Sequence, residues 1–135
     1  MPQDHETAAY WLRRAAEQDH VGAQIRLAAL YVWAPPLLER NDEEAARWYR
    51  RAAELGSSWA RRILGRMYMR GRGVPHDLVE AYAWLANVDD SEESIADRRV
   101  RAILASQMTP EQLEMARRLA ESRNSRGHPL PDSHP

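Results

Sequence analysis

Apolar residues recur along this chain at the spacing of α-helices, and no segment shows the alternation that a β-strand requires. One helix is expected to begin at Asn41, because a cap residue followed three positions later by Glu44 is close to a capping box. A second apolar stripe follows Gly56 and runs over residues 60–68. It ends at residues 71–75, Gly-Arg-Gly-Val-Pro, where two glycines permit a turn and the proline cannot continue a helix. The pattern predicts pairs of amphipathic helices and an all-α fold.

The same helical pattern repeats along the chain. Residues 8–16, Ala-Ala-Tyr-Trp-Leu-Arg-Arg-Ala-Ala, return 37 positions later at 45–53 as Ala-Ala-Arg-Trp-Tyr-Arg-Arg-Ala-Ala, and a third copy begins near Glu80. Because one helical hairpin cannot bury both of its faces, a repeat of this kind indicates hairpins stacked on one another. The aromatic residues that recur with the repeat are expected in the core: Trp11, Tyr31, Trp48, Tyr68 and Trp84. The cap position of the first copy falls on Asp4 and that of the third copy on Asp77.

The C-terminal third of the chain indicates helices that close the stack. A helix is expected over 92–107, with Ile95, Ile103 and Leu104 near its core stripe. Thr109-Pro110-Glu111-Gln112 starts another, with a Thr cap, Pro at the first helical position and Gln to complete the box. The expected organisation is one domain over 1–124, followed by a mobile tail over 125–135. Within it we expect repeats at about 4–40, 41–76 and 77–107, and a capping helix at 110–124.

The most regular copy carries a family resemblance. Residues 45–77 contain Ala-x-x-Trp-Tyr-x-x-Ala-Ala-Glu-x-Gly, then Ala-x-x-x-Leu-Gly-x-Met-Tyr-x-x-Gly-x-Gly-Val-x-x-Asp, and this string resembles a Sel1-like repeat, a relative of the tetratricopeptide repeats. The resemblance covers about residues 4–88. It implies an α–α hairpin solenoid, a right-handed superhelix of about two and a half repeats, which acts as an adaptor or scaffold for other proteins. The first copy departs from the pattern at 33–38, where Trp-Ala-Pro-Pro-Leu-Leu replaces the glycine turn, and the third departs after Val88.

Charge is distributed unevenly although the formal net charge is only −1. Every basic residue is Arg; residues 47–72 hold eight of them against one Glu, whereas residues 73–97 hold seven acidic residues and no Arg. A neutral total gives no overall field that would gather nucleic acid or anionic lipid. The absence of Cys excludes disulfides and thiolate chemistry. No apolar run is long enough for a membrane span, and no secretory signal is evident, so the cytoplasm is the default expectation and the periplasm the alternative.

No motif in the sequence indicates catalysis, a metal site or a cofactor. No two of the five histidines have the i, i+4 spacing of a helical metal site, and we expect them in solvated loops. The Gly71-x-Gly73 pair closes a helix instead of opening one after a strand, which favours a turn over a phosphate-binding loop. Capping and solubility explain the paired acids Asp89-Asp90 and Glu92-Glu93 around a helix start. We therefore expect a protein that is not an enzyme, and a hydrolase using the acids of 89–97 is the lower alternative.

The arginine-rich helices suggest where a partner protein would bind. First helices of hairpin repeats line the concave face, and Arg pairs well with carboxylates, so we hypothesise a groove for an acidic segment of another protein. The alternative is that these arginines only form surface ion pairs with Glu17, Glu43 and Glu54. Trp33 and Trp59 fall outside the repeat register and are candidate contact residues, because Trp is enriched in binding hot spots. The full set of candidate partner-binding residues is Tyr10, Arg13, Arg14, Arg47, Arg50, Arg51, Trp33 and Trp59.

Other functions remain open alternatives at the level of sequence. The chain fits an immunity or inhibitor protein that blocks a cognate toxin or enzyme. Nucleic-acid binding through residues 47–72 would need these arginines on one uninterrupted face. A homodimer through the N-terminal edge is a further hypothesis, since no capping helix precedes the first repeat. The apolar loop at 33–38 is expected to pack on the neighbouring helix or to form an exposed patch.

Overall fold

Seven helices and no strand are found in the residues that the computed structural model describes, which are 3–33, 41–87 and 95–127. Side chains are described for 7–33, 41–87 and 95–123. The helices are α1 (Gln3–Glu17), α2 (Val21–Trp33), α3 (Asp42–Glu54), α4 (Ser58–Arg70), α5 (Leu78–Ala86), α6 (Ile95–Ser106) and α7 (Pro110–Gly127). The prediction of an all-α fold is confirmed. α7 continues to Gly127, three residues beyond its expected end, and the remainder of the expected tail lies outside the described residues.

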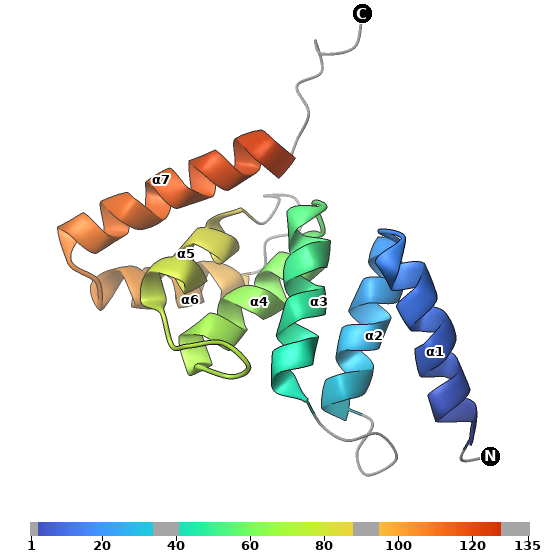
Figure 1. Cartoon of the computed structure of the whole chain (residues 1–135). Coiled ribbons are helices and arrows are strands. Elements are labelled where there is room, and N and C mark those ends of the chain that lie inside the picture. Colours follow the sequence, from blue (N-terminus) through green and yellow to red (C-terminus); the bar gives the residue numbers. More distant parts are fainter. Residues whose placement is uncertain (1–2, 34–40, 88–94, 128–135) are drawn as a thin grey trace, which may run out of the picture.

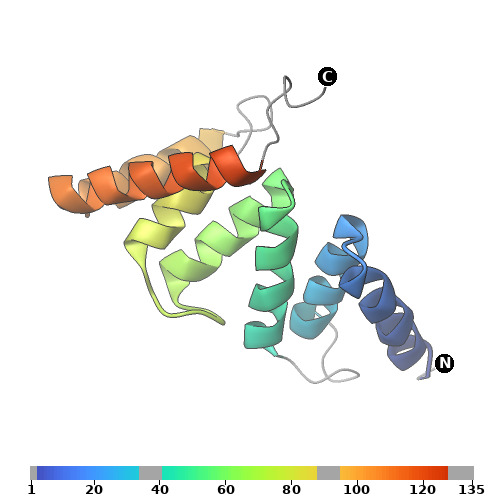
Figure 2. The same cartoon turned by 45° about the horizontal axis from the view of Figure 1, so that its top comes forward.

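The helices form a stack of hairpins that runs from α1 and α2 at one end to α6 and α7 at the other (Figure 1). α2 packs against α3 and α4 packs against α5, so that each hairpin is joined to the next through its second helix. α5 also contacts α6 and α7, and the rotated view shows α7 crossing that end of the stack (Figure 2). None of the described helices is both long enough and apolar enough to cross a membrane.

Helix starts in the second and third hairpins are capped as the sequence predicts. The Oδ1 atom of Asn41 accepts a hydrogen bond from the backbone N of Glu44 at 3.0 Å, and Asp77 accepts from Glu80 at 3.1 Å. The box at the start of α7 is also present, with reciprocal bonds between the residues 109 and 112. The prediction that Asp4 is an N-cap is wrong, because α1 begins at Gln3 and Asp4 lies in its first turn.

Two helix caps were not predicted from the sequence. The Nδ1 atom of His20 accepts from the backbone N of Ala23 at 3.0 Å and caps α2. The hydroxyl of Ser57 accepts from Ala60 at 3.1 Å and caps α4. A histidine acceptor at a helix start is not among the usual cap residues, which explains why the sequence pattern did not reveal it.

The two glycines after α4 form the expected turn. Gly71 ends the helix in the left-handed conformation, with φ of 67°, and Gly73 has φ of 78°. A Cβ atom on Gly73 would lie 2.3 Å from the carbonyl oxygen of Asp42. The turn therefore brings the loop after α4 directly against the start of α3, and only glycine permits this approach.

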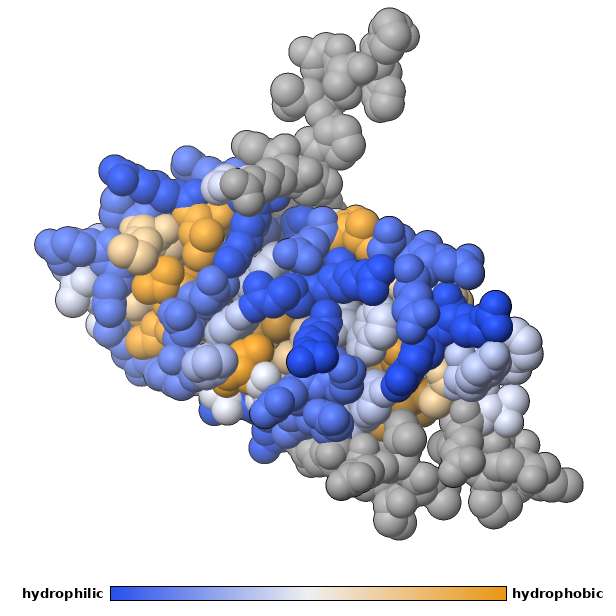
Figure 3. All heavy atoms as spheres, viewed as in Figure 1, coloured by the Kyte–Doolittle hydropathy of each residue, from blue (hydrophilic) through white to orange (hydrophobic). Residues whose placement is uncertain are grey.

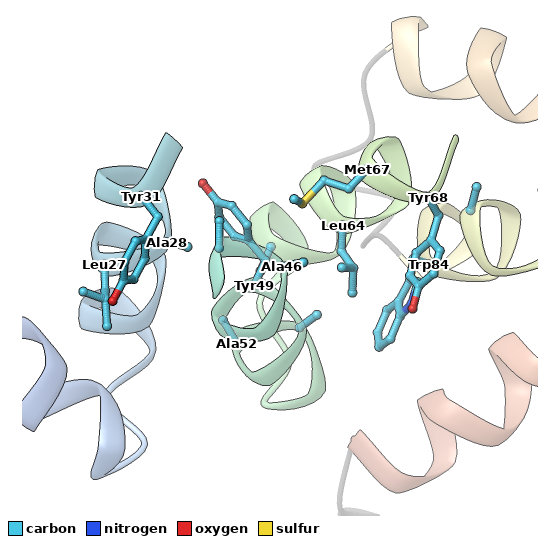
Figure 4. Packing of buried hydrophobic residues seen from close by; sticks show 14 of the residues in the cluster. Leu27, Ala28, Tyr31, Ala46, Tyr49, Ala52, Leu64, Met67, Tyr68 and Trp84 are labelled. Carbon is cyan, nitrogen blue, oxygen red and sulfur yellow. The ribbon is translucent and has the colours of Figure 1, made fainter. Parts of the chain in front are cut away.

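Small and large apolar side chains alternate through the core. Ala45, Ala52 and Ala53 of α3 are fully buried and let neighbouring helices approach closely. Figure 4 shows Tyr49 of α3 between Ala28 of α2 and Leu64 of α4, so one aromatic ring bridges two hairpins. A single hairpin cannot bury both of its faces, so these faces pack against the next hairpin.

Burial of the recurring aromatic residues differs between the repeats. Tyr31, Tyr68 and Trp84 are buried and Trp48 is half-buried, but Trp11 is 61% exposed, so its expected place in the core is wrong. Trp84 lies between Arg50 of α3 and Arg123 of α7, whose guanidinium carbons are 6.0 and 4.3 Å from its ring centre. Trp11 is on α1, which no described helix precedes, and its ring meets that of Tyr10 edge-on, with the ring centres 5.3 Å apart.

The core stripe expected for α6 is also partly wrong. Ile95 is 70% exposed and Ile103 is 55% exposed, whereas Leu104 is buried. The reason is that α6 turns the buried carboxylate of Asp97 toward the stack, so its contact face differs from the purely apolar stripe. The expected helix start at 92, the loop of residues 34–38 and the change after Val88 fall outside the described residues.

Candidate protein-binding surface

The first helices of the hairpins carry the predicted arginines, and Figure 3 shows hydrophilic residues running across the middle of this face over α3. Arg51 of α3 joins two hairpins here. Its Nη2 atom donates to the carbonyl oxygen of Glu17 at 3.0 Å and lies 3.2 Å from a carboxylate oxygen of Asp19, and its guanidinium carbon is 5.3 Å from the Trp48 ring centre. Arg51 therefore fixes the first hairpin on the second.

Arg13 and Arg50 occupy equivalent positions in successive repeats and rest on equivalent aromatic rings. Arg13 donates to the hydroxyl of Tyr31 and its guanidinium carbon is 5.9 Å from that ring centre. The guanidinium carbon of Arg50 is 5.4 Å from the ring centre of Tyr68. Within the described part of the chain neither arginine has a carboxylate partner. Each guanidinium is thus oriented by an aromatic support.

Arg14 and Arg47 are both exposed. Arg14 donates to the hydroxyl of Tyr10 at 3.1 Å. Arg47, whose side chain is 79% exposed, pairs with Glu44 one helical turn earlier at 3.3 Å. The ion pairs expected with Glu43 and Glu54 are absent from the described residues. Arg47 and Arg51 do form surface ion pairs, but with Glu44 and Asp19. An exposed pair of this kind contributes at most about 1 kcal/mol.

Two hollows meet at Arg50. The larger, of about 710 Å³, lies between the start of α3 and the loop after α4, and the smaller, of about 340 Å³, lies where α7 meets α3 and α5. Arg47 lines the larger and Trp84 the smaller. Acidic side chains are also present, Asp42 and Glu43 in the first hollow and Glu54 in the second.

Trp33 and Trp59 lie away from the arginine surface, on the second helices of the first two hairpins. They are 80% and 55% exposed and line one cavity between α2 and α4. The sequence predicted each residue as a contact candidate, but it did not predict that they lie together. The remaining predicted residues, on α1 and α3, do not share this cavity.

One buried acidic residue that supports these surfaces was not predicted to be buried. Asp97 is 1% exposed and its two carboxylate oxygens lie 2.9 Å from Arg62 and 2.9 Å from Arg66. α6 places this acid between two arginines, which its position among the acids of 73–97 did not predict. The other acidic residues of 89–94 lie outside the described residues. Among the described side chains, no group of three or more His, Asp or Glu is arranged to hold a metal ion.

Burial shifts the ionisation of two residues in the middle of the stack. Desolvation raises the pKa of the Tyr49 hydroxyl above its ordinary value. Desolvation also lowers the pKa of Arg61, which is 2% exposed, although its guanidinium donates to two backbone carbonyls. Both residues pack inside the stack, although Tyr49 also borders the cavity between α2 and α4 and Arg61 borders the hollow where α7 meets α3 and α5.

Stacked helical hairpins with a recurrent aromatic and alanine core define a helical repeat protein. Residues 1–20, 21–57 and 60–86 match the model of the Sel1 repeat, and the chain belongs to the Sel1 repeat family. Proteins of this family generally mediate protein–protein interactions. No curated protein matches this chain in sequence.

Two solved structures resemble the chain over most of its length. One is c5321, a protective antigen of uropathogenic Escherichia coli with an SLR fold, which is 30% identical over 91% of this chain with a TM-score of 0.79. The other is a Sel1 repeat protein from Oxalobacter formigenes, 32% identical over 70% of this chain with a TM-score of 0.63. The matched region is 26% of the first protein and 27% of the second, so this chain spans about a quarter of the length of each.

Proposed function

We propose that this chain is a non-catalytic protein-binding module whose arginine surface holds an acidic segment of another protein. The arginine surface consists of Arg13, Arg14, Arg47, Arg50 and Arg51 with Tyr10. Membership of the Sel1 repeat family supports protein binding as the class of function. The choice of surface is our proposal and depends on the residues around Arg50.

The observation that carries the proposal is the position of Arg50. Its guanidinium rests on Tyr68 and borders both hollows, and it has no carboxylate partner among the described residues. Ordering an arginine side chain before binding reduces the entropy lost in the complex. Its planar group presents paired N–H donors that suit a carboxylate. An Asp or Glu of a partner would therefore find a donor already in place, with Arg47 beside it.

Three arginines of α4 argue against a nucleic-acid partner. Arg61 donates to the carbonyl oxygens of Ala53 and Asn87, and Arg62 and Arg66 pair with Asp97. These three side chains are directed into the fold, so the basic segment of 47–72 does not supply the uninterrupted face that a phosphate backbone requires.

The experiment compares partner capture by the wild-type chain and by the charge-reversal variant Arg47→Glu/Arg50→Glu, with proteins identified by mass spectrometry and affinities then measured at increasing salt. We expect the variant to lose at least about tenfold in affinity and the wild-type affinity to fall with salt. The matched control is Arg117→Glu/Arg118→Glu, which reverses two exposed charges on α7.

Because Arg50 also supports Tyr68, the folding of each variant is checked by circular dichroism and thermal unfolding. Arg47→Glu/Arg14→Glu removes only exposed charges and provides a second reading that does not depend on packing. If both surface variants bind the captured protein as tightly as the wild type does, the arginine surface is not the binding site.

A further inference from the structure

The cavity between α2 and α4 has the features of a second, separate binding site. Its volume is about 340 Å³, near the lower end of the range of about 300–1,000 Å³ for ligand clefts. α2 contributes one wall and α4 the other, and Tyr49 of α3 also borders it. Apolar side chains dominate the lining: Ile25, Ala29, Val32, Trp33, Trp59, Ile63 and Met67. A site of this size suits a side chain of a bound segment.

The two tryptophans of this cavity are not needed for the repeat. At the offset of 37 residues that relates the first two hairpins, Trp59 corresponds to Gly22 and Trp33 corresponds to Arg70. The stack therefore does not require a large apolar side chain at either position. Both tryptophans are also mostly exposed. Exposed aromatic residues of this kind, beside an apolar cavity, are typical of binding hot spots.

One wall of the cavity is held in place before any ligand binds. Asp97 pairs with Arg62, and the guanidinium carbon of Arg62 lies 6.0 Å from the ring centre of Trp59. Asp97 also pairs with Arg66, which borders the cavity directly. A buried carboxylate on α6 thus fixes the α4 side of the cavity, and such preorganisation lowers the cost of binding.

The charges at the edge of the cavity select the ligand. Arg66, Arg70 and Arg72 border it against a single acid, Asp42. Arg70 and Arg72 are exposed, and within the described residues neither has an ion pair. An apolar cavity with unpaired arginines at its edge complements an apolar side chain that is followed or preceded by a carboxylate.

We propose that the cavity between α2 and α4 binds a segment of another protein in which a large apolar side chain, inserted between Trp33 and Trp59, stands next to an acidic residue that pairs with Arg70 or Arg72. This site is distinct from the arginine surface of the first helices. It gives the module a second contact with its partner, or a contact with a second partner, on the opposite helices of the hairpins.

The test is selection of a random peptide library displayed on phage against the intact chain, with affinities of the selected peptides then measured in solution. We expect enriched peptides to share a large apolar residue next to Asp or Glu. Their affinity is expected to fall at least about tenfold for Trp33→Ala/Trp59→Ala and for Arg70→Glu/Arg72→Glu. Affinity should be unchanged for Trp11→Ala, which removes another exposed tryptophan, and for Arg26→Glu/Arg117→Glu, which reverses two other exposed arginines.

The outcomes separate this inference from the proposed function, because the two use different variants. Loss of peptide binding in the cavity variants but not in Arg47→Glu/Arg50→Glu supports the cavity as a binding site. This result does not depend on whether the arginine surface also binds a partner. Selection that enriches no peptide, or only peptides that bind the cavity variants as tightly as the wild type, overturns it. Self-association of the wild-type chain that Trp33→Ala/Trp59→Ala abolishes also overturns it, because the occupant is then a second copy of the chain.

Discussion

Gln24 and Arg61 occupy the same position in successive repeats, and each donates a hydrogen bond to the equivalent backbone carbonyl of its own hairpin. The Nε2 atom of Gln24 donates to the carbonyl oxygen of Ala16, and the Nε atom of Arg61 donates to that of Ala53, each at 2.9 Å. Both side chains are buried, at 0% and 2% exposure. Each satisfies a carbonyl near the end of the first helix of its own hairpin, where the intrahelical partner is missing. Arg61 also donates to Asn87 in the next hairpin at 2.9 Å.

Replacing Arg61 is expected to destabilise two helix ends at once. Arg61→Leu removes the guanidinium donor from the carbonyls of Ala53 and Asn87, although Ala53 keeps a bond from the backbone N of Gly56, and should cost about 1–3 kcal/mol. Arg61→Gln keeps a donor for Ala53 only and should cost roughly half as much. Urea unfolding followed by circular dichroism measures both free energies, and equal losses for the two variants would contradict the assignment of separate bonds.

Two glycines within helices should respond to alanine in opposite directions. A Cβ atom on Gly65 would lie 2.8 Å from Cγ of Leu85, so Gly65→Ala forces α4 away from α5 and should cost about 1–3 kcal/mol. Gly22 is exposed and a Cβ there meets only the side chain of His20, at 3.2 Å. Gly22→Ala should therefore stabilise the protein by about 0.5–1 kcal/mol through helix propensity. Thermal unfolding of the two variants tests this prediction, and destabilisation by both substitutions would contradict it.

The buried ion pairs of Asp97 should matter more than an exposed pair of the same type. Asp97→Asn leaves Arg62 and Arg66 without their carboxylate and should cost about 2–4 kcal/mol, because the pairs are largely buried. Glu114→Gln removes an exposed pair with Arg118 and should change stability by less than about 0.5 kcal/mol. Hydrogen exchange of α6 provides the second measurement. Unchanged protection of α6 in Asp97→Asn would show that this residue does not hold the helix.

Equivalent tryptophans in the first and third repeats should differ in their contribution to stability. Trp84 is 1% exposed and Trp84→Ala should cost about 3–5 kcal/mol, whereas Trp11 is 61% exposed and Trp11→Ala should cost less than about 1 kcal/mol. Chemical unfolding gives both values.

Light scattering of the same proteins also tests the hypothesis of a homodimer through the N-terminal edge. If such a dimer forms, Trp11→Ala should shift the measured mass toward that of the monomer.

The burial of Tyr49 predicts a loss of stability at alkaline pH. Its folded pKa is raised by desolvation, so its contribution is complete below the unfolded value of about 10 and is lost as pH rises through that value toward the folded pKa. Tyr49→Phe cannot ionise and should lose less stability between about pH 8 and about pH 11. Urea midpoints at both pH values check this, and parallel losses in the two proteins would contradict it.

The sequence by itself determined the local features of this protein. The period of apolar residues, the caps at Asn41 and Asp77 and the glycines after α4 each depend on residues within a few positions of one another, so they are legible without the fold. The 37-residue repeat added the stacking of hairpins and the family. The sequence also indicated Trp33 and Trp59 as unusual, because neither fits the repeat.

Only the tertiary structure decided which of several similar residues are buried and which distant residues meet. Trp11 and Trp84 have the same place in the repeat, but helices on both sides cover Trp84 alone. Asp97 meets arginines more than 30 positions earlier only because α6 brings it against them. The cavity between Trp33 and Trp59 likewise exists only because α2 and α4 both pack against α3. Burial and pairing of this kind depend on contacts between helices, which no local pattern of residues specifies.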